Sequence, residues 1–212
     1  MTKLAIIHSS PASVAPLKAL AAEILHGCEV INFVDDSILP QLAHNGGNVS
    51  QVAGRIRQYA LFAQEVGAEI ILEACSSVGA VVDEVRPELD IPIVRIDEAM
   101  AETAVQQGTV IGVAATLATT LNPTLALLEQ KAGAAGKTIT LEPRLVAAAY
   151  QKLMAGDAAG HDTDLAAALT ELAASVDVVV LAQASMARVL PRLPQDQQEK
   201  FLTSPQLGMA RI

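Results

Sequence analysis

Short apolar runs alternate with longer amphipathic segments along the whole chain. The apolar runs are rich in Val, Ile, Leu and Ala and have the length of buried parallel strands. They cover residues 4–7, 29–34, 70–74, 93–96, 110–114, 138–141 and 178–181. Segments with helical spacing of their apolar positions lie between them, at residues 15–25, 50–65, 119–132 and 145–154. This alternation predicts an α/β fold with parallel sheets, in which ligands bind beyond the carboxyl ends of the strands.

Two stretches of the chain repeat at a nearly constant offset. Residues 69–77 align without gaps on residues 177–185, and residues 5–10 align on residues 112–117. Two matches at nearly one offset predict a duplicated α/β unit.

The repeat predicts two similar Rossmann-like lobes with parallel sheets, related by pseudo-two-fold symmetry, with a cleft between them. We place the first lobe at residues 1–97 and 194–212, with the C-terminal tail packing back on it, and the second lobe at residues 98–193. The ligand would then lie between two sets of strand ends.

The composition favours a small polar ligand over nucleic acid or a membrane. The net charge is -9 and no dense basic cluster is present, so phosphates and anionic lipids would be repelled. Trp is absent and aromatic residues make up 2%, which leaves no base-stacking platform. Hydrophobic residues make up 51%, yet no apolar run is long enough to cross a bilayer.

We expect a cytoplasmic protein. Residues 1–8 lack the basic region, the long apolar stretch and the cleavage site of a signal peptide. The two cysteines, Cys28 and Cys75, fit a reducing compartment, and their contexts differ enough that a disulfide is not expected. Cys28 stands before the second strand and is interpreted as a core residue.

Cys75 is the main candidate for chemistry. It stands where a strand ends and a helix begins at Ser76 or Ser77. The free N–H groups of a helix N-terminus favour a thiolate, so a pKa near neutral and an acid/base role are expected. The alternative from position alone is a small buried apolar side chain.

Hydroxyl side chains follow several predicted strands. Such donors, without a cationic side chain, suit the binding of a small carboxylate, although each alone is also an ordinary helix cap. The candidate substrate-binding residues are Ser9, Ser10, Ser76, Ser77, Thr116, Thr119, Thr120 and Ser185.

Two histidines have two interpretations each. His8 ends the first strand and is a candidate base or partner of Cys75, or a structural residue. His44 lies beside Gly46 and Gly47, in a segment that is either a mobile loop over a cleft or a plain surface loop. The small residues at 155–162 predict a flexible connection.

The chain resembles the aspartate/glutamate/hydantoin racemase superfamily over most of its length. The resemblance rests on five segments whose order and spacing are similar to those of the family. They are residues 74–79, 35–40 leading to 46–47, 96–100, 112–120 and 181–186.

The resemblance implies two facing lobes with one cysteine on each side of the substrate, one removing the α-proton and the other returning it. It also implies chemistry without metal, pyridoxal phosphate or nucleotide. This agrees with the absence from the sequence of a Gly-rich phosphate loop and of a metal-ligand motif.

The second cysteine of racemising relatives is replaced here by Gln183, which the internal repeat independently pairs with Cys75. An amide does not exchange protons at neutral pH, but it can hydrogen-bond an enolate. One-cysteine relatives include decarboxylases, whose cysteine occupies the position opposite to that of Cys75.

We therefore predict a cofactor-independent racemase- or epimerase-type isomerase that acts at the carbon next to the carboxylate of a small acid, with Cys75 as acid/base and Gln183 opposite it. Two alternatives stay open. The first is a one-cysteine isomerase, decarboxylase or lyase of the same superfamily, and the second is a non-catalytic protein that binds small acids. A homo-oligomer also stays open, since dimers are the commonest assembly of soluble enzymes.

Overall fold

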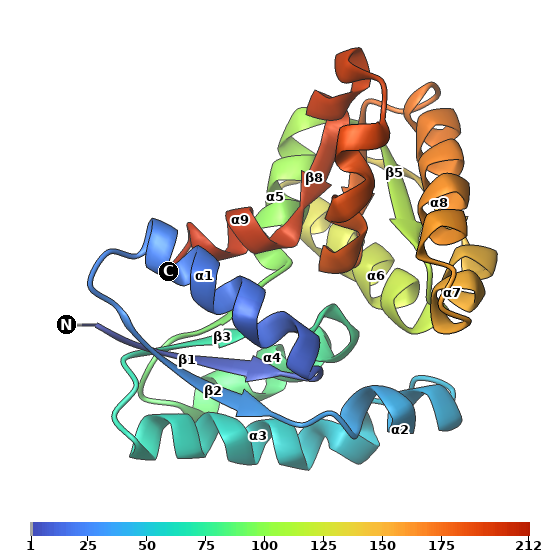
Figure 1. Cartoon of the computed structure of the whole chain (residues 1–212). Helices are drawn as coiled ribbons and strands as arrows, with labels where there is room; N and C mark the ends of the chain where they lie inside the picture. Colours follow the sequence, from blue (N-terminus) through green and yellow to red (C-terminus); the bar gives the residue numbers. More distant parts are fainter. Residues whose placement is uncertain (1) are drawn as a thin grey trace. The chain divides into compact units, whose positions relative to one another are not determined.

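The computed structural model describes residues 2–212 and divides the chain into two compact units. The first comprises Met1–Glu98 together with Pro205–Ile212, and the second comprises Ala99–Ser204. Each unit is an α/β fold built on a four-stranded parallel sheet, as the sequence predicted (Figure 1).

The sheet of the first unit has the strand order β2-β1-β3-β4. Its strands are β1 (Lys3–His8), β2 (Glu29–Val34), β3 (Ile70–Glu73) and β4 (Ile93–Arg95). The two central strands are almost wholly buried, as apolar runs in a sheet covered on both faces must be.

Helices cover both faces of this sheet. One face packs on α1 (Val14–Ile24) and on the C-terminal α9 (Ser204–Met209), which contribute Leu17 and Met209 to the core. The other face packs on α2 (Ile38–His44), α3 (Ser50–Glu65) and α4 (Gly79–Val85). Three short 3-10 turns complete the unit: η1 (Pro11–Ser13), η2 (Ser76–Val78) and η3 (Arg86–Glu88).

The sheet of the second unit has the order β6-β5-β7-β8. Its strands are β5 (Val110–Ala115), β6 (Thr140–Leu145), β7 (Val178–Leu181) and β8 (Phe201–Thr203). One face packs on α7 (Ala147–Met154), α8 (Ala158–Ala173) and the 3-10 segment η4 (Ala184–Arg192). The helices α5 (Glu98–Gln107) and α6 (Ala118–Ala134) lie on the other side of the sheet from α8 (Figure 1), and η5 (Gln195–Lys200) precedes β8.

The two sheets confirm the internal repeat. The order β2-β1-β3-β4 becomes β6-β5-β7-β8 when each strand is replaced by its counterpart in the second unit. The aligned runs correspond to β3 and β7, and to β1 and β5. Strand β8 completes the correspondence because it occupies the place of β4.

The division of the chain differs from the prediction at the C-terminal side. The sequence placed residues 194–204 in the first lobe, but β8 pairs with β7 and so belongs to the second unit. Only Pro205–Ile212 returns to the first unit. Gly208 permits this return, because a Cβ there would collide with the carbonyl oxygen of Ile96.

Two further elements differ from the prediction. The strand predicted at 138–141 is β6, which begins at Thr140 and continues past Pro143 to Leu145; an edge strand can accommodate proline and exposed polar residues. The connection predicted at 155–162 ends early, because the Asp157 side chain accepts a hydrogen bond of 2.8 Å from the Gly160 N–H and caps α8. Among residues 2–212, no helix is long and apolar enough to span a membrane.

Candidate active site

The carboxyl edge of the first sheet places four polar side chains in one row. Ile7 is opposite Glu73, Glu73 is opposite Arg95, and His8 is opposite Val34 in the ladder. Continuing this register past the strand ends gives the row Asp35, Ser9, Cys75 and Asp97. All four residues are buried. Because the strands are parallel, residues from distant parts of the sequence meet at this edge.

The Cys75 thiol is held by hydroxyl and amide donors. Cys75 precedes η2 in extended conformation, so the strand-to-helix position predicted from the sequence is confirmed. The Ser9 hydroxyl, the Ser77 N–H and the Ser77 hydroxyl donate hydrogen bonds to its sulfur, and each favours the thiolate. The sequence-predicted residues Ser9 and Ser77 therefore meet Cys75.

The ionisation of Cys75 is opposite to the prediction. Burial, followed by the negative charge of Glu73, raises the pKa of the Cys75 thiol to about 12, against the donors from Ser9 and Ser77. The N-terminus of a three-residue turn offers too few aligned peptide dipoles to overcome the burial of a negative charge. The thiol is consequently neutral at physiological pH in the substrate-free protein.

Three buried ionisable residues that the sequence did not identify as site residues lie next to Cys75: Glu73, Arg95 and Asp97. Glu73 Oε1 accepts a hydrogen bond of 2.9 Å from the Cys75 N–H, and the Glu73 side chain is fully buried. Arg95 forms a two-armed ion pair with Asp97, with Nε–Oδ1 at 3.0 Å and Nη2–Oδ2 at 3.1 Å. Arg95 and Asp97 are also buried.

The sequence carried a signal for this group. Glu73 and Arg95 are charged residues inside runs otherwise typical of buried strands, and a charge in such a place is paired, neutralised or functional. The pairing itself could not be read from the sequence, because it depends on the register between β3 and β4.

Gln183 occupies the corresponding place in the second unit. It follows β7 and precedes η4 in extended conformation, as Cys75 follows β3 and precedes η2. Its side-chain Oε1 accepts hydrogen bonds from the Thr116 N–H at 2.6 Å and from the Thr116 hydroxyl at 3.0 Å. Thr116 thus holds Gln183 as Ser9 holds Cys75.

The other predicted substrate-binding residues differ in burial and in their hydrogen-bond partners. Ser76 is buried in η2, Thr120 is buried in the first turn of α6, and Thr119 beside it is half-buried. Ser10 caps η1 instead, since its hydroxyl accepts a hydrogen bond from the Ala12 N–H at 3.3 Å. Ser185 is exposed on η4, two residues beyond Gln183.

His8 has a structural environment. Its ring nitrogens lie 2.7 Å from the Ser13 hydroxyl and 2.9 Å from Asn32 Oδ1, and burial lowers its pKa. These two partners occupy both ring nitrogens, which supports the structural interpretation over that of a base for Cys75.

His44 and Cys28 are not joined to this cluster by any described contact. His44 is the last residue of α2 rather than part of a loop, and its Nδ1 lies 2.6 Å from the Pro40 carbonyl oxygen. Cys28 is a free, half-buried thiol packed against the core, as predicted.

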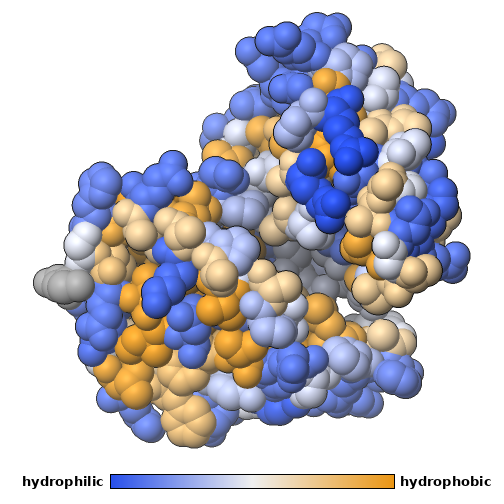
Figure 2. All heavy atoms as spheres, viewed as in Figure 1, coloured by the Kyte–Doolittle hydropathy of each residue, from blue (hydrophilic) through white to orange (hydrophobic). Residues whose placement is uncertain are grey.

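Asp162 is a buried carboxylate in the second unit. His161 Nδ1 lies 2.8 Å from Asp162 Oδ1, and the Asp162 Oδ2 atom accepts from Arg188 at 3.0 Å and Arg192 at 3.1 Å. Both arginines belong to η4, over which Figure 2 shows a strongly hydrophilic patch. The contacts fix η4 to α8.

Among residues 2–212, no cluster of three His, Cys, Asp or Glu side chains is placed to bind a metal ion.

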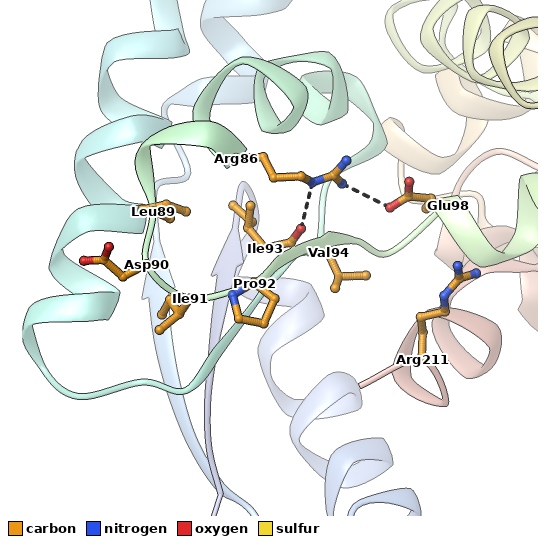
Figure 3. A pocket seen from close by; sticks show the side chains of 9 residues that line it. All are labelled: Arg86, Leu89, Asp90, Ile91, Pro92, Ile93, Val94, Glu98 and Arg211. Carbon is orange, nitrogen blue, oxygen red and sulfur yellow. Dashed lines mark hydrogen bonds and ion pairs between the residues drawn. The ribbon is translucent and has the colours of Figure 1, made fainter. Parts of the chain in front are cut away.

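A hollow of about 490 Å³ lies along β4 (Figure 3), and neither Cys75 nor its partners Ser9 and Ser77 line it. Arg86 spans part of it, donating to the Ile93 carbonyl at 3.3 Å and pairing with Glu98 at 3.3 Å. The hollow includes the residues before β4, whereas ligands of parallel sheets bind beyond the carboxyl ends. We therefore assign the candidate site to Cys75.

The family model for Asp/Glu/hydantoin racemase matches residues 7–212. The chain therefore belongs to the Asp/Glu/hydantoin racemase family, and the resemblance found in the sequence is confirmed. Membership of this racemase family places the protein in the isomerase class, with the reaction unspecified. No curated protein matches the chain in sequence.

Several solved structures share the fold over the whole chain. A protein from Yersinia pestis described as an Asp/Glu racemase has a TM-score of 0.77 at 19% identity, covering 100% of this chain and 97% of that one. An aspartate racemase homologue from Pyrococcus horikoshii has a TM-score of 0.72 at 15% identity, with coverages of 100% and 97%. A variant of arylmalonate decarboxylase has a TM-score of 0.62 at 16% identity, with coverages of 97% and 89%. At these identities the likeness establishes the fold alone.

Proposed function

We propose that the protein is a cofactor-independent isomerase of the racemase or epimerase type. It moves a proton at the carbon next to the carboxylate of a small acid, and Cys75 is its acid/base. The placement of Cys75 carries the proposal, since the thiol stands at the carboxyl end of a central strand with Ser9 and Ser77 donating to its sulfur. Family membership supports the same class of reaction.

The substrate carboxylate is bound by hydroxyl and N–H donors near the strand ends. Ser76 in η2 and the pair Thr119 and Thr120 in the first turn of α6 are the proposed donors. Ser and Thr hydroxyl groups can donate hydrogen bonds to the oxygens of a carboxylate. We propose that the ligand is a small acid, because the candidate donors to its carboxylate are hydroxyl and N–H groups and include no cationic side chain.

Gln183 is proposed as a hydrogen-bond donor and not as a second acid/base. Thr116 engages its Oε1, which leaves the side-chain NH2 group to donate to an enolate oxygen. With a single thiol as acid/base, proton exchange is expected to have one stereochemical outcome.

A second candidate is decarboxylation or a related one-base reaction of the same superfamily. The neutral thiol favours it, because Cys75 with a pKa raised to about 12 is set to donate a proton to an enolate. Arylmalonate decarboxylase shares the fold.

The experiment is a panel of small 2-hydroxy, 2-amino and dicarboxylic acids, incubated with the protein in heavy water and followed by NMR. The proposal predicts deuterium at the α-carbon of at least one acid, with one configuration dominant. Loss of carbon dioxide from malonate-type acids without exchange at other acids would favour the second candidate. Binding of an acid without exchange or decarboxylation would contradict both and indicate a binding protein.

A further inference from the structure

Two arginines of the second unit converge on one buried carboxylate. The Nη2 atoms of Arg188 and Arg192 lie 3.0 and 3.1 Å from the same atom, Asp162 Oδ2. Because both nitrogens contact one oxygen, the two guanidinium groups lie side by side, on the element over which Figure 2 shows a hydrophilic patch. About half of each arginine side chain is exposed to solvent.

The carboxylate between the two arginines is also held from the inside of the protein. Asp162 is buried, and its other oxygen, Oδ1, lies 2.8 Å from Nδ1 of the buried His161. An ionised carboxylate only accepts hydrogen bonds, so the His161 Nδ1–H is the donor. This hydrogen bond, opposed by desolvation and supported by the two arginines, lowers the pKa of Asp162. Asp162 is therefore a fixed anion that determines where both guanidinium groups lie.

The charge of this group is not balanced. Asp162 supplies one negative charge to two guanidinium groups, and among residues 2–212 no second acid forms an ion pair with either of them. Other arginines have an acid of their own, since Arg57 pairs with Glu88 and Arg144 pairs with Glu171. The net charge of the chain is -9, but charges beyond a Debye length of about 8 Å are largely screened. A small anion therefore meets a local excess of positive charge.

The remaining donors of the two guanidinium groups have no protein partner. Every described contact of the Arg188 and Arg192 side chains is made by Nη2, so Nε and Nη1 of both have none within residues 2–212. A guanidinium presents five N–H donors in a planar fork that matches the oxygens of a phosphate group or a carboxylate. Two such forks, placed by one buried acid, are a preformed set of donors for an oxyanion.

We propose that Arg188 and Arg192 form a binding site for a small oxyanion, either a phosphate group or a carboxylate. The anion accepts hydrogen bonds from Nε and Nη1, while Asp162 keeps Nη2 of both arginines. It also supplies the second negative charge that the two adjacent cations lack, which relieves their mutual repulsion. The proposal does not depend on the proposed function, because it uses no residue of the candidate active site.

A purely structural link between η4 and α8 would need only the contacts to Asp162. Lysine at position 188 or 192 keeps a positive charge that can pair with Asp162, but it offers one nitrogen and no planar fork. The double variant Arg188→Lys, Arg192→Lys therefore keeps the charge and removes the unused donors. The matched control is Arg144→Lys, which makes the same change at a partly exposed arginine with an acid of its own.

The experiment titrates the whole protein at neutral pH with inorganic phosphate and, separately, with acetate. The arginine Nε–H groups are followed by NMR, and the signals of Arg188 and Arg192 are assigned by their loss in the single lysine variants. A parallel titration with chloride at equal ionic strength measures the effect of screening alone. Unfolding temperatures of the parent and the variants are recorded over the same anion concentrations.

The Nε–H signals of Arg188 and Arg192 should shift with phosphate or acetate and reach saturation, whereas the signal of Arg144 should change as it does in chloride. The anion that saturates at the lower concentration identifies the bound group as phosphate or carboxylate. The same anion should raise the unfolding temperature of the parent, because it binds the folded state. The double lysine variant should need about 10-fold more anion for the same rise, since charge-assisted hydrogen bonds are lost.

Two results would overturn the oxyanion site. Shifts at Arg188 and Arg192 that grow without saturation and equal those in chloride would show only screening. Anion binding by the double lysine variant as tight as by the parent would show that charge alone is sensed. The NMR titration uses the parent protein, so it decides the first point even if the double variant does not fold.

Discussion

At the residue scale, the environment of Cys75 is decided by competition between burial and hydrogen bonding. Ser9 and Ser77 donate to the sulfur and favour the thiolate, yet burial and the charge of Glu73 prevail and raise the pKa of the thiol to about 12. Hydrogen bonds to a charged group contribute about 1.5–3 kcal/mol each, whereas the effective cost of burying an ion is several kcal/mol. The cysteine therefore needs a proton acceptor before it can act as a base.

Glu73 should make the stability of the protein depend on pH. The unfolded chain releases the Glu73 proton near about pH 4.3, whereas the folded protein retains it to higher pH. Stability from this group is present below the unfolded pKa and is lost as the pH rises through the folded pKa. Glu73→Gln should therefore unfold at a higher temperature than the parent near neutral pH, and the gap should close in acid.

Calorimetric unfolding temperatures, measured from about pH 4, near the ordinary carboxyl pKa, to about pH 8, would check this. Glu65→Gln is the matched control, because it makes the same chemical change at an exposed position at the end of α3. A gap between Glu73→Gln and the parent that is independent of pH would contradict the raised pKa.

Much of the candidate site could be predicted from the sequence, residue by residue. Cys75, Ser9 and Ser77 were identified because they follow strands, and the repeat paired Cys75 with Gln183. Glu73 and its neighbours could not be identified in the same way. Their role depends on which strands are adjacent and on which way a buried carboxyl group turns.

At the element scale, α4 begins against a buried ion pair. A Cβ at Gly79 would lie 2.5 Å from Cζ and Nη2 of Arg95, so the absence of a side chain lets the guanidinium lie against the start of the helix. The Arg95–Asp97 pair leaves this guanidinium little freedom to move.

Gly79→Ala should destabilise the protein by about 1–3 kcal/mol, the usual cost of overpacking a buried site. Gly54→Ala is the control, because Gly54 is exposed within α3 and a methyl group added there would meet no atom within 4 Å. That change should stabilise the helix by about 0.5–1 kcal/mol. Chemical denaturation checks both values, and equal effects of the two substitutions would contradict the close contact with Arg95.

The sequence located every strand of the first unit and the central strands of the second, but it did not give the bounds of β6 and it missed β8. The central strands β1, β3, β5 and β7 were located within one residue at either end, because burial on both faces produces an unbroken apolar run. The edge strand β6 is largely exposed and β8 is only three residues long, so neither carries that signal. The constant offset of the repeat, applied to β4, would have located β8.

At the scale of the whole molecule, the fold repeats one arrangement with different chemistry. The hydroxyl that follows the first strand of each unit binds the side chain that follows the third strand in sequence order. In the first unit this pair is Ser9 and Cys75, and in the second it is Thr116 and Gln183. The supporting hydroxyl is thus repeated, while the thiol of the first unit is replaced by an amide in the second.

The central claim is that Cys75 transfers the α-proton, and the exchange rate of cysteine variants tests it most directly. Cys75→Ala and Cys28→Ala each remove one thiol, and Cys28 is a half-buried core residue outside the candidate site. The measurement is deuterium incorporation from heavy water into the acid that the parent exchanges. We expect Cys75→Ala to lose about 10² to 10⁴-fold in rate and Cys28→Ala to stay near the parent. Full exchange by a correctly folded Cys75→Ala would contradict the account.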